Sequence, residues 1–119
     1  MLRPVSGPVL YHNPRCSKSR AALALLEERG VEFRVVEYLK APLDRTALDA
    51  LSGRLGAPPS DWIRRGESAF QEAGLSPESG DSELLDAIAA HPILLERPIF
   101  ESGERAVVGR PPERVLELL

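Results

Sequence analysis

The sequence of 119 residues has a single cysteine, few aromatic residues and no long apolar run. With Cys16 alone, no disulfide can form within the chain, although a bond to a thiol of another molecule remains open. No stretch approaches the roughly 20 apolar residues that would span a bilayer. Residues 1–8 also lack the apolar run of a signal peptide. These absences predict a cytoplasmic protein, whose thiol is kept reduced.

The chain also has no excess of positive charge. Its formal net charge of −3 at pH 7 predicts no nucleic-acid partner and no membrane partner, because both attract basic surfaces. One cysteine and two histidines, His12 and His91, do not have the spacing of metal ligands. Any anion site must therefore come from a local cluster of arginines.

The order of apolar runs and breaks predicts one domain over residues 1–119, with a loose tail at residues 1–8. A strand over residues 9–11, a helix over 17–29 and a strand over 31–39 form a βαβ unit. Its two strands should be parallel.

The second half of the pattern is a helical insertion followed by a ββα unit. Helices are predicted to begin at Asp44, Ser60 and Ser82, with a break at Gly66 in the second. Two strands follow over residues 98–100 and 106–108, joined by a turn at Ser102–Gly103. A last helix begins at Pro111–Pro112 and should direct Val115, Leu116 and Leu119 to the core. We predict an α/β fold with one mixed sheet, similar to the thioredoxin-like arrangement.

The segment YHNPRCSKSR places Cys16 between the first strand and the first helix. Unpartnered N–H groups and the helix dipole stabilise a thiolate at such a position, and the same N–H groups can bind an oxyanion. Arg15, Lys18 and Arg20 would reinforce both effects. The alternative, that Cys16 is a small buried core residue, is disfavoured by its polar neighbours.

His12 and Ser19 lie near Cys16 in the sequence and lead to separate predictions. His12 either adds positive charge as an imidazolium or is a strand-end histidine bonded to backbone, and both interpretations stay open. Ser19 stands where a Cys-x-x-Cys motif would have its second thiol. An oxidised Cys16 must therefore be reduced by a thiol from outside the chain.

Four blocks in order, HNPRCSKSR, WIRRGE, AAHPILLERPI and VVGRPPERVLELL, resemble the glutaredoxin-linked arsenate reductases, which have a thioredoxin-like fold. The resemblance runs from about Val9 to the C-terminus. It implies that Cys16 attacks the arsenic of arsenate. Glutathione, a co-substrate, then attacks the adduct, and glutaredoxin completes the reduction to arsenite. No bound cofactor is implied.

The resemblance also implies roles for residues around the thiol. Arsenate would be bound by three arginines, since guanidinium forks suit tetrahedral oxyanions; these are Arg64, Arg97 and Arg110. Arg65 is the expected solvated neighbour of the first. Further implied positions are His12, which promotes ionisation of the thiol, Ser19, which bonds it, Arg20, which follows Ser19 and helps to bind the substrate, and Pro98, a cis-proline beside the thiol.

At Ser17–Lys18 the chain departs from the Gly-Thr of well-studied members of that family. A lysine there would strengthen anion binding or indicate another substrate. Two alternatives therefore stand beside arsenate reduction. One is thiol chemistry of the same fold on another oxyanion or on a glutathione mixed disulfide. The other is a non-catalytic regulator that binds RNA polymerase, which Cys16 and the arginine trio argue against.

Overall fold

The computed structural model describes residues 7–119, which form two compact units. The first contains residues 7–37 and 97–119, and the second contains residues 38–96. Most of the predicted tail lies outside the described residues. Its last residue, Pro8, is part of the folded structure, because its carbonyl accepts a hydrogen bond of 2.8 Å from the N–H of Arg34.

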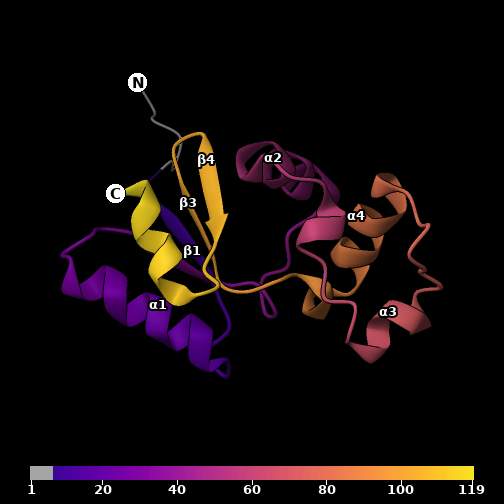
Figure 1. Cartoon of the computed structure of the whole chain (residues 1–119), viewed down its shortest axis with the longest axis horizontal. Helices are drawn as coiled ribbons and strands as arrows, with labels where there is room; N and C mark the ends of the chain where they lie inside the picture. Colours follow the sequence, from indigo (N-terminus) through magenta and orange to yellow (C-terminus); the bar gives the residue numbers. More distant parts are fainter. Residues whose placement is uncertain (1–6) are drawn as a thin grey trace. The chain divides into compact units, whose positions relative to one another are not determined.

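The first unit is a mixed four-stranded sheet with two helices (Figure 1). Its elements are β1 (Val9–His12), α1 (Ser17–Glu28), β2 (Arg34–Glu37), β3 (Ile99–Ser102), β4 (Arg105–Val108) and the 3₁₀ helix η3 (Pro112–Leu118). The strand order is β2-β1-β3-β4, with β1 parallel to β2 and the other pairs antiparallel. The βαβ and ββα units of one mixed sheet, the thioredoxin-like arrangement, are confirmed.

The core of this unit lies between the sheet and its two helices. Helices α1 and η3 contact each other and pack on the sheet (Figure 1). The buried cluster consists of Leu10, Ala22, Leu26, Phe100, Val107 and Val115. Burying one such aliphatic or aromatic side chain stabilises a fold by roughly 1.5–3 kcal/mol. The two helices are therefore attached to the sheet by apolar packing.

The prediction for the last helix was wrong at one residue. Leu119 is 56% exposed, whereas Leu118 packs against the core with Val115. The reason is the helix type, since a 3₁₀ helix has three residues per turn and aligns positions i and i+3. The α-helical spacing used for the prediction placed Leu119 on that face instead of Leu118.

The predicted strand over residues 31–39 is shorter in the structure. Gly30 adopts a left-handed conformation after α1, with φ of 67°, and the N–H of Val31 still bonds to Leu26 at 3.2 Å. The chain must complete this helix end before it can pair with β1, so β2 begins only at Arg34.

The second unit is helical. Its elements are α2 (Arg45–Leu55), η1 (Pro59–Asp61), α3 (Ser68–Glu72), α4 (Asp81–Ala90) and η2 (Pro92–Leu94). The predicted cap is confirmed, because the Asp44 side chain accepts a hydrogen bond of 2.8 Å from the N–H of Ala47. Among residues 7–119, no helix combines the length and apolar character needed to cross a membrane.

The helix predicted from Ser60 does not form as one element. After the short turn η1 the backbone extends, and Ile63 forms an antiparallel bridge with Leu95. The N–H of Arg64 bonds to Leu94 at 2.8 Å, and the carbonyl of Trp62 accepts from Glu96 at 3.0 Å. Pairing with a distant segment thus overrides the local helical pattern, and α3 begins only after the predicted break.

Gly109 follows β4 at a place where a side chain does not fit. A Cβ there would lie 2.8 Å from Cγ of Pro98 and 3.0 Å from Cγ1 of Val115. We expect Gly109→Ala to lower the free energy of unfolding by roughly 1–3 kcal/mol, the cost of overpacking. Gly53→Ala is the matched control: its Cβ would meet nothing within 4 Å, and alanine favours helix α2 by about 1 kcal/mol. Urea unfolding of both variants measures the difference, and equal stability of the two would contradict the packing argument.

Candidate active site

Cys16 is the N-cap residue of α1 and follows a tight turn at the end of β1. Its N–H donates to the carbonyl of Asn13 at 3.0 Å, and its carbonyl accepts from the N–H of Arg20 at 3.0 Å. The residue is 9% exposed and is a free thiol. The sulfur therefore belongs to the helix N-terminus, where free N–H groups and the helix dipole stabilise negative charge.

Asn13 forms this turn, and the sequence prediction gave it no role in the site. Its side-chain Oδ1 accepts from the N–H of Arg15 at 3.0 Å, and its own N–H donates to Oγ of Ser19 at 3.0 Å. The signal was present in the sequence, because Asn-Pro pairs favour turns stabilised by the asparagine side chain.

His12 and Ser19 form a buried hydrogen-bonded pair next to the thiol. Nδ1 of His12 lies 2.6 Å from Oγ of Ser19, and the two residues are 5% and 0% exposed. The Ser19 hydroxyl bonds to His12 and to the backbone of Asn13, and its predicted bond to the sulfur stays a prediction. The pair holds the end of β1 against the first turn of α1.

The environment of His12 favours its neutral ring. Burial lowers its pKa from the usual 6.5, and nearby Arg20 lowers it further, while Glu37 on β2 opposes them. The structure thus favours a neutral ring over an imidazolium, but the partner of that ring is the Ser19 hydroxyl and not the backbone expected from the sequence.

Arg110 is the cation that the fold brings to the thiol. Its Nη2 lies 3.7 Å from Sγ of Cys16, although 94 residues separate the two. Its Nε donates to the carbonyl of Arg97 at 2.8 Å, which fixes the guanidinium beside the sulfur. Arg110 therefore contacts the sulfur and has a guanidinium suited to an anion bound there, while its predicted role in binding substrate stays a prediction.

Arg97 and Pro98 lie next to this contact. The Arg97–Pro98 peptide bond is cis, as the resemblance implied. The carbonyl of Pro98 accepts from the N–H of Gly109 at 2.8 Å, and this bond sets the course of the chain into Arg110. The Nε and Nη1 atoms of Arg97 are buried. The first unit therefore brings Arg110 to Cys16 and holds it through the backbone carbonyl of Arg97, while the predicted substrate contact of the Arg97 side chain stays a prediction.

Arg20 has a different position from the other two arginines. Its side chain is exposed, and its Nη1 donates to the carbonyl of Pro14 at 2.9 Å. In the structure it supports the turn before Cys16, and its predicted role in binding substrate stays a prediction.

Arg64 belongs to the second unit, and its predicted substrate contact likewise stays a prediction. Its Nη1 lies 2.6 Å from Oε2 of Glu67, and its Nε lies 3.9 Å from Oε1 of Glu96. The sequence prediction did not identify these carboxylates, although Glu67 stands at i+3. Arg65 is exposed and donates to the carbonyl of Ser60 at 3.3 Å, so it is the more solvated of the two arginines, as expected.

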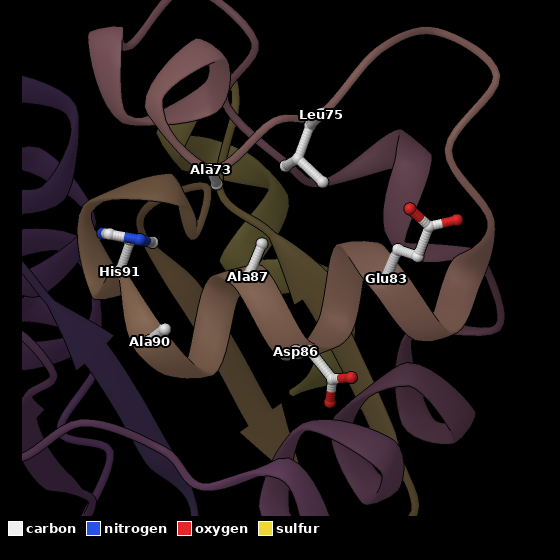
Figure 2. Close-up of a pocket in the computed structure, with 7 residues that line it drawn as sticks. All are labelled: Ala73, Leu75, Glu83, Asp86, Ala87, Ala90 and His91. Carbon is white, nitrogen blue, oxygen red and sulfur yellow. The ribbon is translucent and has the colours of Figure 1, made fainter.

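The second unit also contains a cavity of about 370 Å³ (Figure 2). Its lining residues are Ala73, Leu75, Glu83, Asp86, Ala87, Ala90 and His91. The two carboxylates would repel an oxyanion, and Asp86 already pairs with Arg45 at 2.6 Å. This cavity does not have the chemistry of the thiol site. Within residues 7–119, no group of three or more potential metal ligands occurs.

The profile of the ArsC family matches residues 11–118, a range that contains every residue of the site described above. The chain belongs to the ArsC family. Its resemblance to arsenate reductases of thioredoxin-like fold is confirmed at the level of family and fold.

Individual members of the ArsC family are similar over nearly the whole chain. A protein of Neisseria meningitidis named arsenate reductase is 47% identical over 112 residues, which cover 92% of this chain and 96% of the relative. The Escherichia coli K12 protein YfgD, described as uncharacterized, is 45% identical over 92% of this chain and 94% of its own length. The solved structure named arsenate reductase from Vibrio cholerae has a TM-score of 0.90 and 41% identity, and the match covers 98% of this chain and 100% of that one.

We predict that His12 titrates below pH 6.5, because burial disfavours its charged form. The unfolded chain then binds the proton more tightly. The contribution of His12 to stability is therefore present above pH 6.5 and is lost as the pH falls through the folded pKa. An NMR titration of the imidazole protons measures the midpoint, with His91→Asn to assign the resonance. A midpoint at or above 6.5 would contradict the prediction.

Proposed function

We propose that this chain reduces arsenate to arsenite, with Cys16 as the nucleophile. The observation that carries the proposal is the contact of 3.7 Å between Nη2 of Arg110 and Sγ of Cys16 at the N-terminus of α1. It places a fixed cation and free N–H groups beside one sulfur, which suits both a thiolate and an oxyanion. Relatives named arsenate reductase support the choice of arsenate.

In the first step, the Cys16 thiolate attacks arsenic, and an arsenate oxygen leaves as water after protonation. Negative charge develops on the remaining oxygens. The N–H groups of the first turn of α1 and the guanidinium of Arg110 would stabilise that charge from fixed positions. The product is a covalent sulfur–arsenic(V) adduct on Cys16.

The adduct must then accept two electrons from outside thiols, because Cys16 is the only thiol of the chain. Glutathione bonds to the arsenic of the adduct, and a second oxygen leaves as water. A glutaredoxin thiolate then attacks the glutathione sulfur, and the bond of that sulfur to arsenic breaks with its electron pair left on arsenic, which becomes arsenic(III). Water finally cleaves the bond between Cys16 and arsenic, which releases arsenite and the free thiol. Overall, arsenate and two thiols yield arsenite, one disulfide and water. A reduced thiol pool is needed throughout, which suits the cytoplasm.

The other predicted residues take supporting roles in this proposal. Neutral His12 acts through Ser19, which holds the turn that carries Cys16. Arg97 and Arg64 would complete the oxyanion site, and Arg20 would support the turn through the Pro14 carbonyl. These roles stay predictions.

The activity itself is tested by arsenate-dependent NADPH oxidation with glutathione, glutathione reductase and glutaredoxin. We expect turnover by the wild type and none by Cys16→Ser, because serine is far less nucleophilic than a thiolate. Replacing the glutathione system by thioredoxin and its reductase should abolish turnover. Turnover with thioredoxin alone would contradict the proposed reductant, and no turnover with either system would contradict arsenate reduction.

Arg110→Lys tests the cation beside the sulfur. Lysine keeps the charge but cannot donate to the Arg97 carbonyl and the sulfur from one planar fork. Loss of one charge-assisted hydrogen bond should lower kcat/KM for arsenate roughly 10- to 100-fold. Arg114→Lys is the matched control, since Arg114 is exposed and pairs with Glu117, at 3.4 Å. Equal kinetics of the two variants would contradict the role of Arg110.

A further inference from the structure

The first turn of α1 has a charge pattern that opposes helix stability. The dipole places partial positive charge at a helix N-terminus, so acidic residues are favoured there and cations are disfavoured. In α1 the first turn contains no acidic residue, and the second helical position is Lys18. A lysine at this position lowers the stability of the first helix turn. Departures from local rules of this kind are expected at functional sites.

The absence of acidic residues extends beyond the helix start. The first 26 residues contain no Asp or Glu, in a chain whose net charge is −3. The charged residues nearest to Cys16 in the sequence are therefore all cations, with Arg15 directly before it and Lys18 two residues after it. The positive surface is a local exception in an acidic protein.

Arg15 and Lys18 lack the side-chain partners that most arginines of the structure have. Both side chains are exposed, and among residues 7–119 neither forms an ion pair or a side-chain hydrogen bond. Arg45, Arg64 and Arg114, in contrast, pair with carboxylates. The positive charges of Arg15 and Lys18 are therefore available to an external anion.

Both cations are also close enough to act on a molecule that approaches the sulfur. Their Cα atoms lie at most about 7.6 Å from that of Cys16, since consecutive Cα atoms are 3.8 Å apart. This is within the Debye length of about 10 Å at 0.1 M ionic strength. Charges at this range attract an approaching anion before it touches the thiol.

We propose that Arg15 and Lys18 form a docking site for the carboxylates of an anionic small thiol or disulfide that reacts at Cys16. The reductant would be drawn towards the sulfur by these two exposed cations, while the contact of 3.7 Å between Arg110 and the sulfur is a separate interaction. The inference rests on the proposed function for the thiol that reacts with Cys16, which is glutathione. Glutathione suits a site of two cations because this γ-glutamyl tripeptide carries more carboxylates than amines.

The test uses thiol–disulfide exchange and no arsenate. The Cys16 thiolate attacks one sulfur of oxidised glutathione, the disulfide bond breaks, and glutathione thiolate leaves while a Cys16–glutathione disulfide remains. The rate is compared with that of the neutral 2-hydroxyethyl disulfide, by mass spectrometry at low salt. The ratio of the two rates isolates the effect of charge from the reactivity of the thiol.

We expect Arg15→Gln and Lys18→Gln each to lower this ratio about twofold to threefold, the Coulomb effect of one charge near 7 Å in water. The double variant should lower it further, and 0.5 M salt should remove the difference. Arg29→Gln is the matched control, because Arg29 is an exposed cation at the opposite end of α1 and its loss should leave the ratio unchanged.

Four results would overturn the inference. One is an unchanged ratio in the double variant. Another is equal loss in Arg29→Gln, which would show only the overall charge of the protein. The third is a Cys16 that reacts with neither disulfide. A higher KM for arsenate in Lys18→Gln with an unchanged ratio would assign the lysine to the oxyanion instead. Failure of arsenate reduction leaves the exchange measurement readable, so the two proposals fail separately.

Discussion

The hydroxyl of Ser19 joins the end of β1 to the first turn of α1, and the position of the thiol depends on this junction. It accepts the N–H of Asn13 at 3.0 Å and bonds to Nδ1 of His12 at 2.6 Å. Both side chains are buried, so each polar atom needs the partner that the other supplies. These bonds hold the turn between the strand and the helix, in which Cys16 is the N-cap of the helix.

Apolar packing positions Arg110, the residue that contacts the thiol from the C-terminal part of the chain. Val115 of η3 lies in one buried cluster with Leu26 of α1 and Phe100 of β3. Gly109 fits between Val115 and Pro98 because it has no Cβ. This packing directs the following residue, Arg110, to a sulfur 94 residues earlier in the chain. The chemistry of the site thus depends on core contacts that contain no catalytic group.

How far the site could be predicted from sequence differs between residues. Cys16 at a helix start, the cap at Asp44 and the parallel βαβ unit follow from local patterns, and all three are present in the structure. The start of a helix at Ser60 was wrong, because the chain extends after a short turn there and Ile63 pairs with Leu95, and no local pattern contains that partner. The charge of His12 was left open because burial lowers its pKa, and the sequence alone does not show which residues are buried.

The sequence by itself determined which groups are available: one thiol, no second cysteine to resolve it, and cations without acidic residues on both sides of it. It also determined the order of helices and strands, since the spacing of apolar residues and the positions of prolines and glycines affect the backbone over only a few residues. Only the tertiary structure decided that Arg110 contacts the sulfur, that Ser19 bonds His12, and that Leu118 rather than Leu119 enters the core. The physical reason is that these contacts depend on the packing of elements distant in the chain, or on the turn-by-turn geometry of one helix.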